Sequence, residues 1–265
     1  MVVSIGAQVF QHEVMGAVGV TIILVAIATL AYRRGTVSAD AADSVRRNHI
    51  RSLSSVMLGL LSLLLGFSFS MAMKRYTVRR DLVVKEANAI GTAWLRAGLL
   101  SNSQRSAVRE LLQRFTDVRL RIYAAADDSA LVAEGLRECA EIESELWQHA
   151  EVSVRETPNV ITATFITTLN QLIDTDAERI AAARSQMPAG VWIVLIVVAA
   201  LGSWTSAYAA GCDGIRSPFT RLFLPLRISL VILLVFDLTH ERRGIIGISQ
   251  QPLIDLHGLF RTKSP

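Results

Sequence analysis

Hydrophobic residues are concentrated in four long blocks, separated by stretches in which apolar and polar positions alternate. The blocks cover residues 14–32, 53–73, 191–210 and 222–238. A helix rises about 1.5 Å per residue, so roughly 20 apolar residues are needed to cross about 30 Å of hydrocarbon. The first three blocks carry no charged side chain, whereas the fourth contains Arg227 and Asp237. The pattern predicts about four transmembrane helices.

The fourth block is the least regular of the four because Arg227 lies about one turn inside it. A long arginine side chain near the end of a span can extend to the lipid headgroups. The alternative is an arginine that is buried, paired or directed into a pore. Both interpretations stay open at the level of the sequence, and Asp237 is expected at the opposite interface.

Residues 74–188 are polar overall but repeat their apolar positions every three or four residues, which is typical of amphipathic helices. The breaks at 101–103, 127–129 and 157–159 contain Ser, Asn or Asp, the residues that cap helix starts. These breaks predict a four-helix bundle outside the membrane, and the second span is expected to run directly into its first helix. We therefore divide the chain into four parts: a first transmembrane pair (1–73), the bundle (74–188), a second pair (189–240) and a tail (241–265).

Charge within the predicted bundle is unevenly distributed. Residues 74–121 hold 11 Lys/Arg and 4 Asp/Glu, a balance of +7, and residues 122–188 hold 4 and 12, a balance of −8. Two hairpins of opposite sign attract each other when stacked, although solvated faces explain most single residues. The whole chain is 51% hydrophobic with a net charge of +4, and its basic residues do not alternate with aromatic residues as in a nucleic-acid site. The lipid bilayer is therefore the expected partner, and nucleic acid is not.

Chemistry-bearing motifs are missing from the sequence. The five histidines do not pair with Cys, His or carboxylates at metal-ligand spacing, and Cys139 and Cys212 are predicted to be buried free thiols. There is no glycine-rich phosphate loop and no nucleophile elbow. We expect a protein that is not an enzyme and that carries no metal or cofactor.

The second span differs from the others because its small residues form one stripe. The stripe contains Ser55, Gly59, Ser62, Gly66 and Ser70. Such a stripe lets another helix approach closely, and the alternative is that it lines a pore in an oligomer. Phe67 and Phe69 are then candidates for an apolar constriction. The basic residues that follow are candidates for attracting anions: Lys74, Arg75, Arg79 and Arg80.

Several segments around this span resemble the bacterial bestrophin-like domain family. They are LGFSFSMA (65–72), RY (75–76), VKEANAIGTA (84–93), RRG (242–244) and SQQPL (249–253). The family-motif residues are Glu86, Asn88, Ser249, Gln250, Gln251 and Pro252. The resemblance extends from the second span to the C-terminus, and many members of the family have no assigned function.

The resemblance to the true bestrophins is more distant and implies a pentameric anion channel with a pore-lining second span and a cytoplasmic helical domain. The tandem aromatic residues that follow this span in bestrophins are missing from residues 74–80, and the acidic calcium clasp is also absent. The short basic loops, with Arg33, Arg34 and Arg51, favour termini outside the cell, whereas the resemblance places termini and bundle in the cytoplasm. We expect a bacterial inner-membrane protein with a cytoplasmic bundle.

Two functions are compatible with these patterns. The first is a homo-oligomeric channel that passes anions along its second span. The second is a non-conducting sensor or scaffold whose helical bundle binds a ligand or a partner. A ring-shaped oligomer would favour the channel, and a monomer would favour the sensor.

Overall fold

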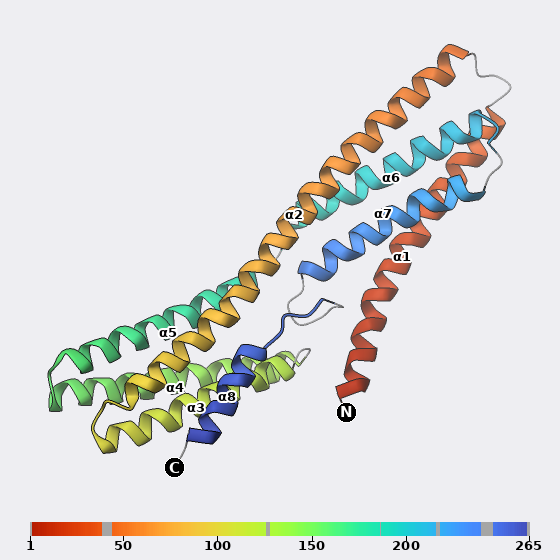
Figure 1. The fold of residues 1–265 in the computed structure, drawn as a ribbon. Coiled ribbons are helices and arrows are strands. Elements are labelled where there is room, and N and C mark those ends of the chain that lie inside the picture. Colours follow the sequence, from red (N-terminus) through yellow and green to blue (C-terminus); the bar gives the residue numbers. More distant parts are fainter. Residues whose placement is uncertain are drawn as a thin grey trace. The chain divides into compact units, whose positions relative to one another are not determined.

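The structure is a computed structural model that describes residues 2–38, 44–125, 128–185, 187–215, 218–239 and 246–263. Within these residues every regular element is a helix (Figure 1). The helices are α1 (Val2–Val37), α2 (Ser44–Ala97), α3 (Asn102–Ala124), α4 (Ser129–Glu156), α5 (Val160–Arg184), α6 (Ala189–Cys212), α7 (Pro218–Thr239) and α8 (Gln251–Lys263). The predicted all-α fold class is confirmed.

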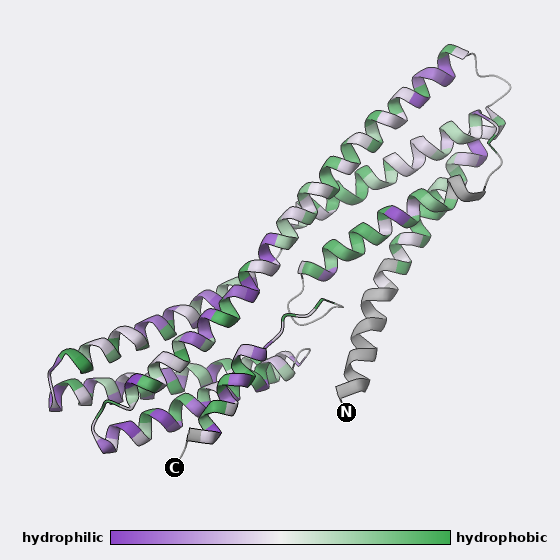
Figure 2. Cartoon of the chain, viewed as in Figure 1, coloured by the Kyte–Doolittle hydropathy of each residue, from purple (hydrophilic) through white to green (hydrophobic). Residues whose placement is uncertain are grey.

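Four helices are long and apolar enough to cross a membrane: α1, α2, α6 and α7. The hydrophobic colour in Figure 2 follows these helices, and purple residues gather on α3, α4 and the second half of α2. The first helix is longer than the predicted span of 14–32 because Arg33 and Arg34 end the apolar block without ending the helix. The second span continues into the polar region with no break at residue 73, as predicted.

The chain divides into two compact units. The first, here called the membrane unit, comprises Met1–Arg75, Gln186–His240 and Gly244–Ile246. The second unit comprises Tyr76–Ser185, Glu241–Arg243 and Gly247–Pro265. The unit boundary in α2 lies close to the predicted boundary at residue 73. Each unit has its own buried apolar cluster.

In the membrane unit, α1 packs against α6 and α7. The helices come closest where Gly35 of α1 faces Gly211 of α6. A Cβ atom added at Gly35 would lie 3.1 Å from the Gly211 Cα, and one added at Gly211 would lie 3.0 Å from the Gly35 Cα. Lipid is as apolar as leucine, so close backbone packing of this kind is what holds membrane helices together. Cys212, next to this contact, is a buried free thiol as predicted.

The core of the second unit is formed by α3, α4, α5 and α8 together with the second half of α2. Phe115, Leu112 and Leu172 are among its fully buried side chains. The tail helix α8 belongs to this core: its Phe260 stacks on Trp94 of α2 at 5.2 Å between ring centroids. The amphipathic pattern of residues 253–260 is compatible with a membrane surface or with the bundle, and the structure packs this segment in the core of the second unit.

The helix starts of the second unit follow the predicted breaks. Asp128 caps α4 by accepting bonds from the backbone N–H groups of Ala130 and Leu131 at 2.9 and 3.1 Å. Asn159 and Thr162 form a capping box at the start of α5. Ser101 precedes α3 without a side-chain cap bond. The breaks therefore located all three starts, including the one that no side chain caps.

Ion pairs on the surface of the second unit join its basic and acidic halves. Lys85 of α2 pairs with Glu178 of α5 at 2.7 Å, and Arg114 and Arg121 of α3 both pair with Glu138 of α4. These pairs are exposed, so each contributes at most about 1 kcal/mol. The opposite charges predicted to attract are thus in contact, but they are not the main source of stability.

Candidate functional site

The small-residue stripe of α2 points away from the rest of the protomer, except at Ser55, which borders a pocket that α6 and α7 also line. Ser55, Gly59, Ser62, Gly66 and Ser70 are all exposed. A Cβ atom added at Gly59 or Gly66 would meet nothing within 4 Å. The Ser62 hydroxyl donates to the Leu58 carbonyl oxygen at 2.9 Å, so its proton is already satisfied within the helix. The stripe therefore packs on no other helix of the described protomer.

The opposite face of α2 makes the contacts with the membrane unit. Ser54, Leu61, Ser68 and Ala72 are buried there, at spacings of seven, seven and four residues. Leu58 and Leu61 lie 3.7 and 3.6 Å from a Cβ built on Gly202 of α6. The most apolar window of α2 is nevertheless only 17% buried, against 44% for that of α7. Most of this span thus faces the surroundings of the protomer.

The candidate constriction residues differ in exposure. Phe67 is 63% exposed, and Phe69 is half-buried. Both lie near the end of the predicted span, and Phe67 is adjacent to Gly66 on the outward side of α2. The Phe67 ring is therefore mostly exposed, whereas the Phe69 ring is partly packed within its own protomer.

The four basic candidates that follow the span have different environments. Lys74 and Arg80 are exposed, and Arg80 pairs with the adjacent Asp81 at 3.2 Å. Arg75 is half-buried. Arg79 is 4% exposed and donates to the carbonyl oxygens of Ala182 and Ser185 at 3.2 and 3.0 Å, at the C-terminal end of α5. Arg79 thus caps a helix in this structure, and Lys74 and Arg80 are the basic groups open to solvent.

A buried charge cluster occupies the centre of the second unit, and we define it as Glu86, Arg119, Asp176, Arg179 and Gln250. The Arg119 guanidinium bridges two carboxylates, with Nε 2.6 Å from Glu86 Oε1 and Nη1 2.9 Å from Asp176 Oδ1. Glu86 Oε2 pairs with Arg179. Arg179 Nη2 also donates to Gln250 Oε1 at 2.8 Å. Two carboxylates and two guanidinium groups therefore balance one another out of contact with water.

Two family-motif residues meet in this cluster, because Glu86 of α2 and Gln250, just before α8, both bind Arg179. The other motif residues have local roles or face solvent. Asn88 is exposed, and the Ser249 hydroxyl accepts from Gln251 N–H at 3.2 Å at the start of α8. Gln251 donates to Asp255 at 2.7 Å, and Pro252 lies in the first turn of α8. The motif thus fixes the tail on the helical core. Arg242, Arg243 and Gly244 lie outside the described residues.

The sequence patterns described above assign no role to the partners of Glu86, which are Arg119 and Arg179, or to Asp176. The signal was present, since Arg119 lies four residues after Phe115 and Arg179 seven residues after Leu172, on the faces that are buried. A charged residue at a core position calls for an opposite charge on a neighbouring helix.

Glu143 of α4 lies beside this cluster and is half-buried. Burial raises the pKa of its carboxyl group to about 7, and repulsion from Asp176 adds to this against the attraction of Arg119. Its Oε1 atom is buried and has no hydrogen-bond partner among the described residues. The neutral acid is thus the favoured form of this side chain in the folded protein below about pH 7.

Replacement of Glu143 by Gln should make the protein less sensitive to alkaline pH. The pKa of Glu143 is raised in the folded state, so its stabilising contribution is complete below the ordinary carboxyl pKa of about 4.3 and is lost as pH rises through about 7. Thermal unfolding of the full chain in detergent at about pH 5 and pH 8 measures this. Glu143→Gln should show a smaller decrease in Tm than the unsubstituted protein, whereas Glu145→Gln, at an exposed position of the same helix, should not. An equal decrease in Tm between these two pH values in the unsubstituted protein and in both variants would contradict the raised pKa of Glu143.

Among the described residues, no group of three or more His, Cys, Asp or Glu side chains is arranged to hold a metal ion. Two of the five histidines have other partners: His149 Nδ1 lies 2.7 Å from Gln104 Oε1, and His257 Nε2 lies 2.9 Å from Asp117 Oδ1. The features that stand out are thus the exposed α2 stripe and the buried charge cluster.

A comparison with protein families identifies the family of this chain. The family model described as Bestrophin-like domain matches residues 19–253, and the protein therefore belongs to the bestrophin-like family. This confirms the resemblance found in residues 65–93 and 249–253. No curated protein matches the chain.

Solved structures share the fold over nearly the whole chain. A single-substitution form of a bacterial bestrophin homologue from Klebsiella pneumoniae has a TM-score of 0.69 at 14% identity, covering 92% of this chain and 97% of that one. Another substituted form of a Klebsiella pneumoniae bestrophin homologue has a TM-score of 0.64 at 15% identity, covering 91% and 98%. A third structure, described as that of a membrane protein, has a TM-score of 0.67 at 13% identity, covering 92% and 99%. At these identities the likeness shows a common fold.

Proposed function

We propose that this protein is a homo-oligomeric anion channel of the bacterial inner membrane, in which the α2 stripes of several copies together line the pore. The observation that carries the proposal is the outward position of the stripe: Ser62, Gly66 and Ser70 are exposed on a helix whose opposite face is packed. A packing role for this stripe would require a helix against it, and the described protomer provides none. Contact with another copy of the chain, or a pore shared by several copies, would use this stripe, whereas contact with lipid alone does not require small residues.

The composition of the stripe is suited to a pore wall. Glycine and serine leave room along the helix, and serine oxygens and glycine backbone give a mildly polar surface in an otherwise apolar segment. Leu60, Leu63 and Val56 are also exposed on this helix and provide apolar surface for contacts with lipid or with neighbouring copies. The bestrophin-like family supports the same arrangement, because the bestrophins it resembles are oligomeric anion channels.

Exposed basic residues provide the expected preference for anions. A ring of Lys74, one from every copy, would create a positive potential that raises the local anion concentration, whereas the charge of Arg80 is balanced by Asp81. Phe67 is the best-placed residue for an apolar constriction, since its ring is 63% exposed. Wetting of such a constriction controls conduction in channels. We place the second unit in the cytoplasm, following the family resemblance.

The oligomeric state of the purified protein tests this proposal. Native mass spectrometry of the full chain in mild detergent should give a single closed oligomer whose mass is a multiple of 29.0 kDa and large enough for a ring. A monomer or dimer, in both mild detergent and lipid nanodiscs, would contradict the channel, because one or two α2 helices cannot enclose a pore. That result would favour the sensor or scaffold.

A further inference from the structure

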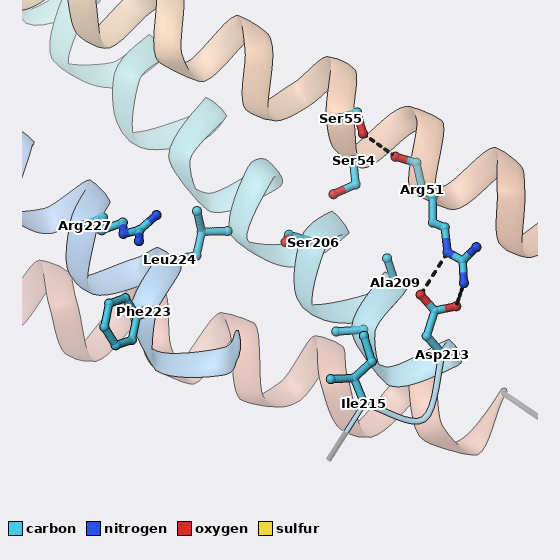
Figure 3. Close-up of a pocket in the computed structure, with 11 residues that line it drawn as sticks. Arg51, Ser54, Ser55, Ser206, Ala209, Asp213, Ile215, Phe223, Leu224 and Arg227 are labelled. Carbon is cyan, nitrogen blue, oxygen red and sulfur yellow. Dashed lines mark hydrogen bonds and ion pairs between the residues drawn. The ribbon is translucent and has the colours of Figure 1, made fainter. Parts of the chain in front are cut away.

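The membrane unit contains a pocket of about 710 Å³ between the start of α2, the end of α6 and the first turns of α7 (Figure 3). Its polar lining includes Arg51, Ser54, Ser206, Asp213 and Arg227. Phe223 and Leu224 contribute an apolar part of its wall. The family match assigns no role to this pocket, and it is separate from the outward stripe except for Ser55, which lies at its edge.

The two arginines of the pocket differ in how their charge is balanced. Arg51 makes a two-bond ion pair with Asp213, with Nη2 and Nε 2.7 and 2.9 Å from its carboxylate oxygens. Arg227 has no carboxylate within ion-pair distance among the described residues, and its guanidinium lies over the Phe223 ring at 5.3 Å. The pocket therefore carries one positive charge that no described acidic residue compensates.

The position of the pocket along the spans suits a lipid headgroup. Arg51 precedes the apolar part of α2, and Asp213 directly follows α6, so both mark one edge of the hydrocarbon region. Arg227 lies five residues into the apolar segment Leu222–Thr239, or about 7 Å along the helix, close to where phosphates and acyl chains meet. An uncompensated charge within the apolar part of a membrane helix is costly, so a counter-charge there is favourable.

We propose that this pocket binds an anionic glycerophospholipid, with its phosphodiester on Arg227 and its headgroup hydroxyls against Ser54 and Ser206. One uncompensated arginine matches one phosphodiester charge, and basic pockets between membrane helices are a known type of lipid site. The acyl chains would follow the exposed apolar side chains of α7, among them Leu226 and Leu230, which are 50% and 65% exposed. A free inorganic phosphate ion could also pair with Arg227, but it has no acyl chains to cover this apolar surface.

Lipid-dependent stability of the full-length protein tests the proposal. In neutral detergent, added phosphatidylglycerol should raise Tm and should be retained in native mass spectra. Phosphatidylcholine should give a smaller shift, and inorganic phosphate should give none. The shift caused by phosphatidylglycerol should be lost in Arg227→Gln and retained in Arg46→Gln, because Arg46 is exposed near the same end of α2 but outside the pocket.

A second variant keeps the test independent of the folding of Arg227→Gln. Ser206→Leu fills the pocket while leaving both arginines in place, and it should also reduce retained phosphatidylglycerol. Equal shifts from the two phospholipids, or an Arg227→Gln protein that still responds fully to phosphatidylglycerol, would overturn the proposal. A shift from inorganic phosphate alone would also overturn it and would show that the pocket is a site for the free ion. None of these outcomes depends on conduction.

Discussion

Replacement of Arg119 by Met should lower the free energy of unfolding of this protein by about 3–5 kcal/mol, the range for a buried ion pair that loses one partner. Arg119 is 4% exposed and is the only described residue that bridges both Glu86 and Asp176. Without it, two carboxylates share the charge of Arg179 in a site that water does not reach. Denaturant-induced unfolding of the full chain in detergent, followed by tryptophan fluorescence, measures the loss.

The control for this prediction lies on the same helix. Arg121 is exposed and pairs with Glu138 on the surface, so Arg121→Met should cost less than about 1 kcal/mol. Adding Asp176→Asn to Arg119→Met should restore part of the lost stability, since it removes one of the two uncompensated carboxylates. Two results would show that the buried charge cluster is not a stabilising network. One is a similar loss of unfolding free energy in Arg119→Met and Arg121→Met, and the other is a double variant that is less stable than Arg119→Met and than Asp176→Asn.

The overall fold could be predicted from the sequence because its signals are local. Four apolar blocks predict the membrane helices, and the polar breaks at 101–103, 127–129 and 157–159 predict the helix starts of the polar region. The contribution of α8 could not be derived in this way. Its amphipathic pattern fits a membrane surface as well as a protein core, and long-range contacts such as those of Phe260 with Trp94 and of His257 with Asp117 distinguish the two.

The buried charge cluster was harder to predict because it depends on contacts between distant parts of the chain. Glu86 and Arg179 are 93 residues apart, and Arg179 and Gln250 are 71 residues apart. The family motif identified Glu86 and Gln250, but it carried no information about the arginines between them. Asp176 lies four residues after Leu172 on a buried helix face, and a buried acid requires a charged or hydrogen-bonding partner.

The α2 stripe, unlike the charge cluster, is visible in the sequence as a regular spacing of small residues. The spacing alone does not decide whether the stripe packs on another helix or lines a pore. Within the protomer the stripe does not pack on any described helix. The α2 face that contains Leu61 and Ala72 makes the packing contacts instead. Which surface covers the stripe in the membrane is a question about the assembly.

Anion flux through the stripe is the second prediction with a large expected effect. Gly66 faces open space, so Gly66→Leu should fold normally in the protomer but place a bulky side chain in the shared pore and block it. Phe67→Ala should widen the apolar constriction and raise the flux, and Phe69→Ala should change it less because that ring is half-buried. Gly190→Ala, at an exposed glycine of α6 that also faces open space, is the control.

The most direct test of the pore is chloride efflux from liposomes that contain equal amounts of correctly assembled protein. The account predicts efflux for the unsubstituted protein and for Gly190→Ala, a higher rate for Phe67→Ala, and a background rate for Gly66→Leu. Efflux that is absent from every form, or that is the same in Gly66→Leu as in the unsubstituted protein, would contradict a pore lined by α2.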